Sequence, residues 1–245
     1  MTDRGWALVT GAARRVGRAL ALAAAASGHD VLVHARCRDD GEETASLVRR
    51  LGRRAEILEA DLTDTAACCG LIARAPAPPT LLVNSASVFE DDRLQTLTPD
   101  HWDALLGPNL RAPILLAQAF AATAPTDSLI VNIIDQRVWR LNPRYFSYTI
   151  SKAALWAATQ TMAQALAPHI RVNAIGPGPT LPNIYQSAAA FDAEAAALPL
   201  GRPIDPAEIG DALRFLIGAR SVTGQMIAVD GGQHLAWRTP DLPDD

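Results

Sequence analysis

Short apolar runs alternate with longer alanine-rich segments along nearly the whole chain, and this alternation constrains the fold more than any other feature. The short runs are β-branched or leucine-rich and end at turn residues, as buried strands do, whereas the longer segments have helical spacing. The pattern predicts one doubly wound α/β domain, a seven-stranded parallel sheet with helices on both faces. The expected strands are Trp6–Thr10, Asp30–His34, Arg54–Leu58, Thr80–Asn84, Ser128–Asn132, Ile170–Ala174 and Met226–Val229, and the expected helices are 15–27, 41–52, 64–74, 102–123, 145–167 and 206–218.

One segment, 177–199, interrupts this alternation. It places four prolines around an alanine-rich helical patch, between the sixth strand and the last helix. It is either a mobile loop that covers a substrate or a plain surface excursion, and the sequence leaves both interpretations open. The rest of the pattern is continuous, so we expect residues 1–245 to form a single domain.

The first strand runs directly into a turn, TGAARRVGR over residues 10–18, that contains Gly11 and Gly17. Glycines at such a turn let the backbone approach a pyrophosphate, whose charge the following helix N-terminus stabilises. Two glycines also fit an ordinary strand-to-helix turn. The residues at the other strand ends therefore distinguish a dinucleotide site from an ordinary turn, because a sheet of this Rossmann type binds ligands beyond the carboxyl ends of its strands.

The end of the second strand indicates which dinucleotide would bind. An acidic side chain there would pair with the ribose 2′-hydroxyl of NAD, but the chain has His34, Arg36 and Arg38 instead, and Arg14 precedes the first helix. Guanidinium groups suit a phosphate dianion, so these residues predict NADP(H). The alternative is that the arginines are solvated surface residues.

Polar or small residues also follow the third and fourth strands. Asp61-Leu62 is suited to the adenine amino group, and the small residues Asn84-Ser85-Ala86-Ser87 would allow close approach of a ribose. Each of these segments alone could be turn chemistry. Together, in register with four successive strands, they support a nucleotide site.

Tyr148 and Lys152 are four residues apart on an expected helix after the fifth strand, so their side chains share one face. The lysine ammonium would favour the tyrosinate and lower the phenol pKa from about 10 toward a working range. Tyr148 would then donate or accept a proton near neutral pH. In isolation the same spacing describes any helix that carries one aromatic residue and one solvated base.

The combined motifs resemble those of the short-chain dehydrogenase/reductase family, over nearly the whole chain from Thr10-Gly11 to Val229-Asp230-Gly231-Gly232. The resemblance implies a catalytic tetrad of Asn, Ser, Tyr and Lys, of which Asn109, Tyr148 and Lys152 are matched. In that family the Asn holds a helix bulge and a water that relays protons to Lys152. The resemblance also implies cofactor contacts from Gly11, Arg14, Arg15, Val16, Gly17, His34, Arg36, Arg38, Asp61, Leu62, Asn84, Ser85, Ala86, Ser87, Tyr148, Lys152, Pro177, Gly178 and Thr180.

Two departures from the common family pattern point to a particular substrate chemistry. Arg15 replaces the usual third glycine, and Asp135 stands thirteen residues before the tyrosine, where the catalytic serine is expected. A serine hydroxyl donates to a carbonyl oxygen, whereas an ionised carboxylate only accepts and would repel a developing alkoxide. A heterocycle with N–H groups would suit Asp135, as acceptor or, with a pKa raised by burial, as proton source.

These two departures resemble the pteridine reductase branch of the family. That branch also places a Phe five residues beyond the Asn of the fourth strand, as Phe89 is here. The resemblance implies that Phe89 stacks a pterin against the nicotinamide, that Ser87 touches cofactor and substrate, and that Arg15 lies near the phosphates and the substrate. The alternative makes Phe89 a core residue and Arg15 a surface base.

Composition excludes several other classes. A formal net charge of -4 gives no reason to expect nucleic acid or a membrane surface as partner, and no membrane span or secretory signal is visible. Three cysteines and five histidines show no metal spacing, which suggests reduced thiols in a cytoplasmic protein. The family resemblance implies a homodimer or homotetramer.

Three functions stay open at this stage. The leading hypothesis is an NADPH-dependent reductase of a dihydropterin or dihydrofolate. The second is a carbonyl or 3-oxoacyl reductase. The third is a non-catalytic sensor or scaffold that binds NADPH, although such a binder needs no proton relay.

Overall fold

The computed structural model describes residues 4–183 and 186–237, and the remaining positions of the expected domain lie outside the described residues. Seven parallel strands form one sheet in the order β3-β2-β1-β4-β5-β6-β7. The chain moves outward from β1 to β3, returns to place β4 beside β1, and then moves outward in the other direction. The strands are β1 Trp6–Val9, β2 Asp30–Ala35, β3 Ala55–Glu59, β4 Leu81–Asn84, β5 Ser128–Ile133, β6 Ile170–Pro177 and β7 Met226–Val229.

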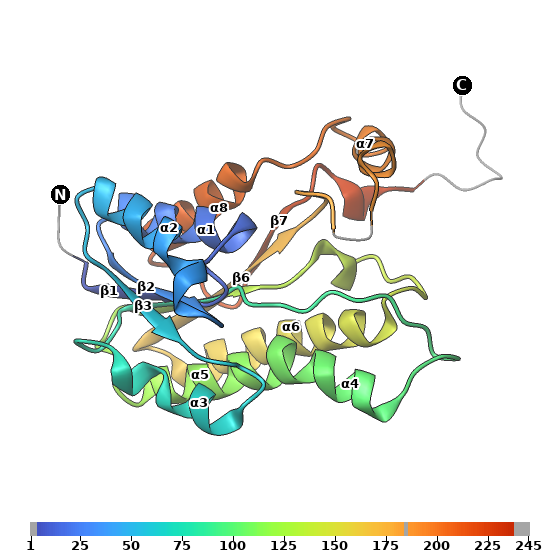
Figure 1. The fold of residues 1–245 in the computed structure, drawn as a ribbon. Helices are drawn as coiled ribbons and strands as arrows, with labels where there is room; N and C mark the ends of the chain where they lie inside the picture. The colour runs from blue at the N-terminus through green and yellow to red at the C-terminus, as the bar shows by residue number, and fades with distance from the viewer. Residues whose placement is uncertain (1–3, 184–185, 238–245) are drawn as a thin grey trace.

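Helices cover both faces of this sheet (Figure 1). Helices α1 (Arg15–Ala26), α2 (Arg38–Arg50) and α8 (Pro206–Gly218) lie on one face, whereas α4 (Pro99–Leu106), α5 (Ala112–Ala121) and α6 (Phe146–Leu166) lie on the other. Each face has its own buried apolar cluster, one centred on α1 and α8 and the other on α5, with strand residues from both halves of the sheet. The doubly wound α/β architecture expected from the sequence is confirmed.

The inner strands are apolar on both faces because helices cover both. All residues of β1, β2, β4 and β5 are buried, which explains why these strands read as continuous Val, Leu and Ile runs rather than alternating patterns. The carboxyl ends of β1 and β4 meet where the strand order reverses, which is the place where such sheets bind ligands.

Three expected helices differ from the structure. The helix expected over 102–123 is divided into α4 and α5 by a π-helical segment, Gly107–Arg111. Helix α2 begins at Arg38 rather than 41, with two aspartates in its first turn that favour the helix dipole. The third expected helix shortens to α3, Thr65–Gly70, followed by one 3₁₀ turn at Ile72–Arg74.

The 177–199 segment contains a helix, α7 (Ala188–Ala196), with residues 184–185 outside the described residues. Phe191 and Leu198 are buried, and Leu198 belongs to the apolar cluster on the α1 side of the sheet. Hence the second half of this segment is anchored to the body of the domain.

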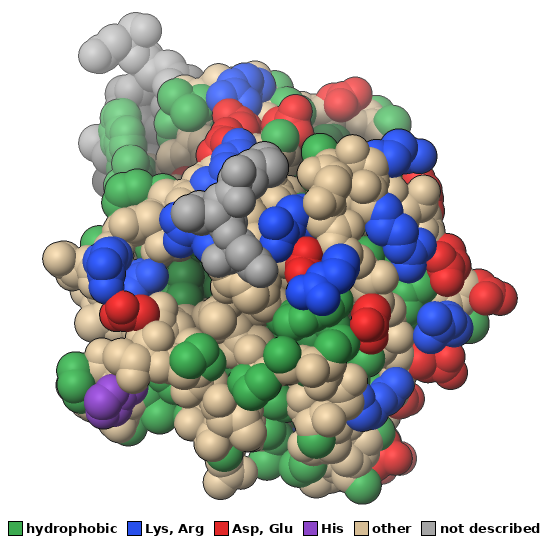
Figure 2. Space-filling model, turned by 90° about the vertical axis from the view of Figure 1, so that its left-hand side faces the viewer, with side chains coloured by type: hydrophobic (Ala, Val, Ile, Leu, Met, Phe, Trp, Pro, Cys, Tyr) green, Lys and Arg blue, Asp and Glu red, His purple; other side chains and the backbone are tan. Residues whose placement is uncertain are grey.

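The edge of the sheet at which the strands begin carries charges of both signs. Figure 2 views the side on which the strands have their amino ends, and its basic and acidic side chains are interspersed.

Over residues 4–183 and 186–237, every helix is too short or too polar to cross a membrane, and no group of three or more His, Cys, Asp or Glu side chains is arranged to hold a metal ion.

Candidate active site

The turn between β1 and α1 is built around two close backbone approaches. Gly11 has a φ of +64°, and a Cβ there would lie 2.8 Å from the Cα of Ala86. A Cβ on Gly17 would lie 2.0 Å from the carbonyl oxygen of Gly11, so α1 packs directly on the turn. The backbone of the turn can pack this closely only because these two residues have no side chains.

His34 lies beneath this turn and supports it. The Gly11 N–H donates to His34 Nδ1 at 3.1 Å, and the other ring nitrogen lies 3.1 Å from the Ala60 carbonyl oxygen. The Nδ1 atom must accept, so Nε2 carries the proton and the ring is neutral. Burial lowers the pKa of His34 to about 4. Both ring nitrogens are engaged within the protein, so His34 supports the turn and does not project into the 2′-phosphate region.

The arginines near the turn take different directions. Arg36 is exposed near Asp61, and its charge adds to the hydrogen bonds from Thr63 that lower the pKa of that carboxylate. Arg38 bends toward β3, where its Nη1 lies 3.4 Å from the Ile57 carbonyl oxygen. Arg14 is exposed at the N-cap of α1. Arg36 and Arg14 therefore remain available at the edge where a 2′-phosphate would lie.

The ends of β1 and β4 are tied together by one hydroxyl. Thr10 Oγ1 accepts hydrogen bonds from the Ser85 and Ala86 N–H groups, at 2.9 and 3.0 Å. By contrast, the Asn84 side chain is buried and donates to Asn132 Oδ1 at 2.9 Å, and the Leu62 side chain is in the core. The Asn84 and Leu62 side chains are consequently buried in the protein interior.

Asn109 occupies the π-helical segment and clamps the loop after β4. Its side chain accepts from the Val88 N–H at 2.8 Å and from Ser87 Oγ at 3.1 Å, and it donates to the Val88 carbonyl oxygen at 2.8 Å. It also donates to Ser151 Oγ on α6 at 3.3 Å. The helix bulge expected at Asn109 is therefore present, and it links the β4 loop to the helix that carries Tyr148.

Asp135 and Tyr148 meet beyond the end of β5. The Tyr148 hydroxyl donates to Asp135 Oδ2 at 3.0 Å, and the Arg137 N–H donates to Oδ1 at 2.8 Å. Burial raises the pKa of Asp135, against the opposing effect of these hydrogen bonds. Both carboxylate oxygens thus have donors, and the pair is placed to share and transfer a proton.

Lys152 lies one turn further along α6, with its Nζ donating to the Ile133 carbonyl oxygen at 2.8 Å and 5.6 Å from the centre of the Tyr148 ring. Burial lowers the pKa of Lys152 to about 8. The expected lowering of the Tyr148 pKa by this lysine is wrong for this arrangement. Burial and the Asp135 carboxylate raise the pKa of Tyr148, so the hydroxyl keeps its proton.

An aromatic stack borders the pair. The Phe89 ring contacts Tyr148 edge-on at 4.7 Å and stacks on Tyr145 at 4.3 Å, with an interplanar angle of 14°. Tyr145 has a left-handed φ of +53° at the N-cap of α6. Phe89 is therefore beside Tyr148 rather than in the core, and Tyr145 is a candidate site residue that sequence reasoning missed.

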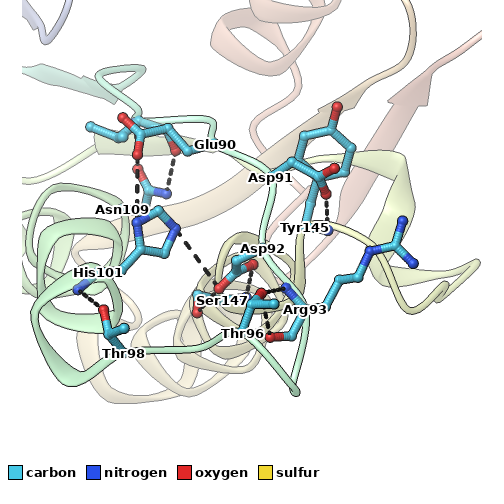
Figure 3. Close-up of polar contacts among 11 residues, drawn as sticks. Glu90, Asp91, Asp92, Arg93, Thr96, Thr98, His101, Asn109, Tyr145 and Ser147 are labelled. Atoms are coloured by element: carbon cyan, nitrogen blue, oxygen red, sulfur yellow. Dashed lines mark hydrogen bonds and ion pairs between the residues drawn. The ribbon is translucent and has the colours of Figure 1, made fainter.

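Two adjacent acids hold the N-terminus of α6 in place (Figure 3). Asp92 is buried and accepts from both the N–H and the hydroxyl of Ser147, while Asp91 accepts from the Tyr145 N–H at 3.1 Å and from Arg144 at 2.7 Å. Ser147 immediately precedes Tyr148. Hence the loop after Phe89 fixes both the aromatic stack and the start of α6.

Arg15 connects the glycine turn to the 177–199 segment. Its guanidinium donates to the carbonyl oxygens of Leu181 and Pro182, each at 3.0 Å. Nearby, a Cβ on Gly178 would lie 2.7 Å from the Cα of Asp230, and the Thr180 hydroxyl donates to the Gly178 carbonyl oxygen. Pro177 ends β6, so this segment leaves the sheet at the same edge as the turn.

A doubly wound sheet, a glycine turn before α1 and a Tyr–Lys pair after β5 define a dinucleotide-dependent oxidoreductase. A family model described as enoyl-(acyl carrier protein) reductase matches residues 11–234. The 3-oxoacyl-(acyl-carrier-protein) reductase FabG of Aggregatibacter actinomycetemcomitans is 33% identical, over 92% of this chain and 97% of that protein. The chain belongs to the short-chain dehydrogenase/reductase family.

Two similar solved structures come from Brucella. FolM alternative dihydrofolate reductase 1 from Brucella canis, complexed with NADP, is 46% identical with a TM-score of 0.94, covering 99% of each chain. The protein of that name from Brucella suis, also in complex with NADP, has the same identity and TM-score and covers 99% of this chain and 100% of that one. The resemblance to the pteridine reductase branch, stated from Arg15 and Asp135, agrees with these matches.

Proposed function

We propose that this protein is an NADPH-dependent reductase that transfers hydride to a dihydropterin-type ring. The observation that carries the proposal is the hydrogen bond of 3.0 Å between the Tyr148 hydroxyl and Asp135, at the position where the family's usual pattern has serine. The likeness to two proteins named alternative dihydrofolate reductase supports it.

The residues at the carboxyl edge of the sheet fit NADPH. A Cβ on Gly11 or Gly17 would fill the turn, α1 begins where a pyrophosphate would lie, and Arg36 is exposed beside the end of β2. Arg14, Arg36 and the backbone of Ser85 and Ala86 would hold the dinucleotide. When bound, NADPH supplies the hydride.

Asp135 selects the substrate ring. Its carboxylate would accept a hydrogen bond from a ring N–H, and its raised pKa lets the acid form supply a proton to a ring nitrogen. The same carboxylate would oppose the negative charge that develops on a ketone oxygen during reduction. A heterocycle is therefore the better substrate.

Tyr148 and Lys152 complete proton transfer. The Tyr148 hydroxyl is protonated and donates to Asp135, so it would orient the carboxyl group that gives its proton to the substrate, and solvent would return a proton to Asp135 afterwards. Lys152, with its pKa lowered to about 8, would hold a positive charge beside the tyrosine while that proton moves. Asn109 fixes α6 through Ser151 and keeps these groups in register.

The test is NADPH oxidation by the purified protein with dihydrobiopterin, dihydromonapterin or dihydrofolate. We expect turnover with at least one of them and a fall of about 100-fold or more in Asp135→Asn, because the amide has no acidic proton to give. No oxidation of NADPH with any of the three would reject the proposal.

A second candidate is a 3-oxoacyl or carbonyl reductase, favoured by the 33% identity to FabG. It predicts turnover with 3-oxoacyl thioesters or simple ketones, and Asp135→Ser should raise that activity because a hydroxyl donates to the carbonyl oxygen. The sensor or scaffold alternative gains support if the protein binds NADPH but turns over neither substrate class, and if Tyr148→Phe changes no measurable turnover.

We also propose that the protein forms a homodimer or homotetramer. Leu106, Leu110 and Ile114 line an apolar hollow along α4, the π-helical segment and α5. Burial of these side chains against a second copy would remove apolar surface from water. Light scattering after size-exclusion chromatography measures the mass, and Ile114→Glu should shift an oligomer toward the monomer.

The 177–199 segment is proposed to close the substrate site from the side of the turn. Arg15 holds its first part through the Leu181 and Pro182 carbonyl groups. Arg15→Met should weaken substrate binding more than NADPH binding if the segment has this role. Equal loss of both affinities would assign Arg15 to the cofactor alone.

A further inference from the structure

Arg137 is a charged residue beside the catalytic pair that the proposed proton transfer does not use. It lies in the 3₁₀ turn Gln136–Val138 directly after Asp135. Its guanidinium carbon is 5.1 Å from the centre of the Tyr145 ring, and Tyr145 stacks on Phe89. Arg137 is therefore part of the wall that surrounds the Asp135–Tyr148 pair.

The charge of Arg137 has no carboxylate counterpart in the described part of the chain within the 4.0 Å of an ion pair. Its Nε is shielded from solvent and has no hydrogen-bond partner there. The hydrogen bond from Arg137 to Asp135 comes from the backbone N–H and not from the guanidinium, although the charges of the two side chains interact. Arg144, whose guanidinium lies 5.4 Å from the same Tyr145 ring, is by contrast paired with Asp91.

An acceptor from outside the protein would satisfy this guanidinium. A shielded donor without a partner costs free energy, and the cost is recovered when a ligand acceptor reaches it. The planar fork of an arginine matches a carboxylate in particular, because two parallel N–H groups face two oxygens. An uncharged hydroxyl would leave the positive charge unanswered.

We infer that Arg137 binds a negatively charged group on the substrate outside its ring, so that the substrate is a reduced pterin with a carboxylate-bearing tail, as in dihydrofolate. This inference rests on the proposed function. It assigns ring recognition to Asp135, Tyr148 and Phe89, and recognition of the tail to Arg137. A pterin with an uncharged side chain, such as dihydrobiopterin, would use only the first set.

The test compares kcat/KM for dihydrofolate and dihydrobiopterin in the wild type and in Arg137→Met, which removes the charge and keeps much of the side chain length. We expect the ratio of the two values, dihydrofolate over dihydrobiopterin, to fall about 10- to 100-fold through the KM for dihydrofolate. Arg137→Lys should show an intermediate loss, because it keeps the charge without the fork. Calorimetry with folic acid and biopterin, in the presence of NADP, should show the same selective loss of affinity.

The matched control is Arg144→Met, which removes the paired arginine on the same Tyr145 ring and should leave the ratio as in the wild type. An equal loss for both pterins in Arg137→Met would overturn the inference and assign Arg137 to the electrostatics of Asp135. An unchanged ratio in both Arg137 variants would overturn it as well. A wild type that reduces another dihydropterin but not dihydrofolate would overturn the inference and leave the proposed function standing. A wild type that oxidises NADPH with none of the three dihydropterins rejects the proposed function, and the inference with it.

Discussion

The glycine turn and the catalytic cluster are held together in different ways. In the turn, the closest contacts of Gly11 and Gly17 are with backbone atoms, the His34 side chain lies beneath, and the two glycines are six residues apart. The catalytic cluster of Asn109, Asp135, Tyr148 and Lys152 is assembled from α6, the end of β5 and the π-helical segment, and the loop after β4 braces it.

This difference separates binding from chemistry. Substitutions in the turn change backbone geometry and should lower stability and NADPH affinity together. Substitutions in the catalytic cluster remove one proton donor or shift one helix end, and should leave the backbone of the turn and NADPH binding unchanged. Each prediction below tests whether the two regions are independent in this sense.

The largest effect is expected from Tyr148→Phe. Loss of the hydroxyl removes the donor to Asp135 and should lower kcat/KM by about 100- to 10,000-fold. Because the turn is untouched, the dissociation constant of NADPH, measured by fluorescence titration, should stay within a few-fold of the wild type. A parallel loss of NADPH binding would contradict the separation.

Gly17→Ala should instead lower stability and weaken NADPH binding. The new Cβ would lie 2.0 Å from the Gly11 carbonyl oxygen, and the backbone must shift to relieve the contact. We expect the free energy of unfolding to fall by about 3 kcal/mol, with weaker NADPH binding. Denaturant unfolding measures the first effect. Gly218→Ala is the control, because a Cβ there meets nothing within 4 Å, and it should be close to neutral.

His34 makes the turn sensitive to pH. Its pKa is about 4 in the fold and about 6.5 when unfolded, so the unfolded state binds the extra proton between these values. The stability that the neutral ring contributes is complete above pH 6.5 and is lost as the pH falls toward 4.

Between pH 7 and 5 this loss should be about 2 kcal/mol, from about 1.4 kcal/mol per pH unit below 6.5. Urea unfolding at a series of pH values tests it. His34→Gln should flatten the dependence, whereas His169→Gln, at an exposed position, should follow the wild type. A slope that survives in His34→Gln would place the titrating group elsewhere.

The sequence predicted the turn well because its signals are local. Apolar runs fix the strands, and the glycines and arginines follow them directly, so the order of elements determines which edge they share. Asp135 and Tyr148 were expected together from the resemblance to the family, in which a serine stands at the position of Asp135, and the structure places the Tyr148 hydroxyl 3.0 Å from Asp135 Oδ2.

What the sequence could not supply depends on contacts between distant segments. The rise in the Tyr148 pKa depends on burial and on a carboxylate from another element, and the separation of Tyr148 and Lys152 by four residues carries no information on either. The direction of His34 was missed for the same reason, because its partners Gly11 and Ala60 lie more than twenty residues away. Arg137 and Tyr145 had one available signal, their nearness in sequence to Asp135 and Tyr148.

The smallest effect concerns the two acids that hold α6. Asp92→Asn should lower the free energy of unfolding by about 1.5 kcal/mol, because a buried carboxylate that accepts twice from Ser147 becomes an amide with one oxygen. Asp91→Asn, at an exposed position paired with Arg144, should cost about 0.5 kcal/mol or less. Ser147→Ala combined with Asp92→Asn should cost less than the sum of the single changes, because the two share one contact. If Asp91 and Asp92 prove equal and additive with Ser147, the α6 N-terminus is not held by the buried acid, and the catalytic cluster depends on its neighbours less than the contacts indicate.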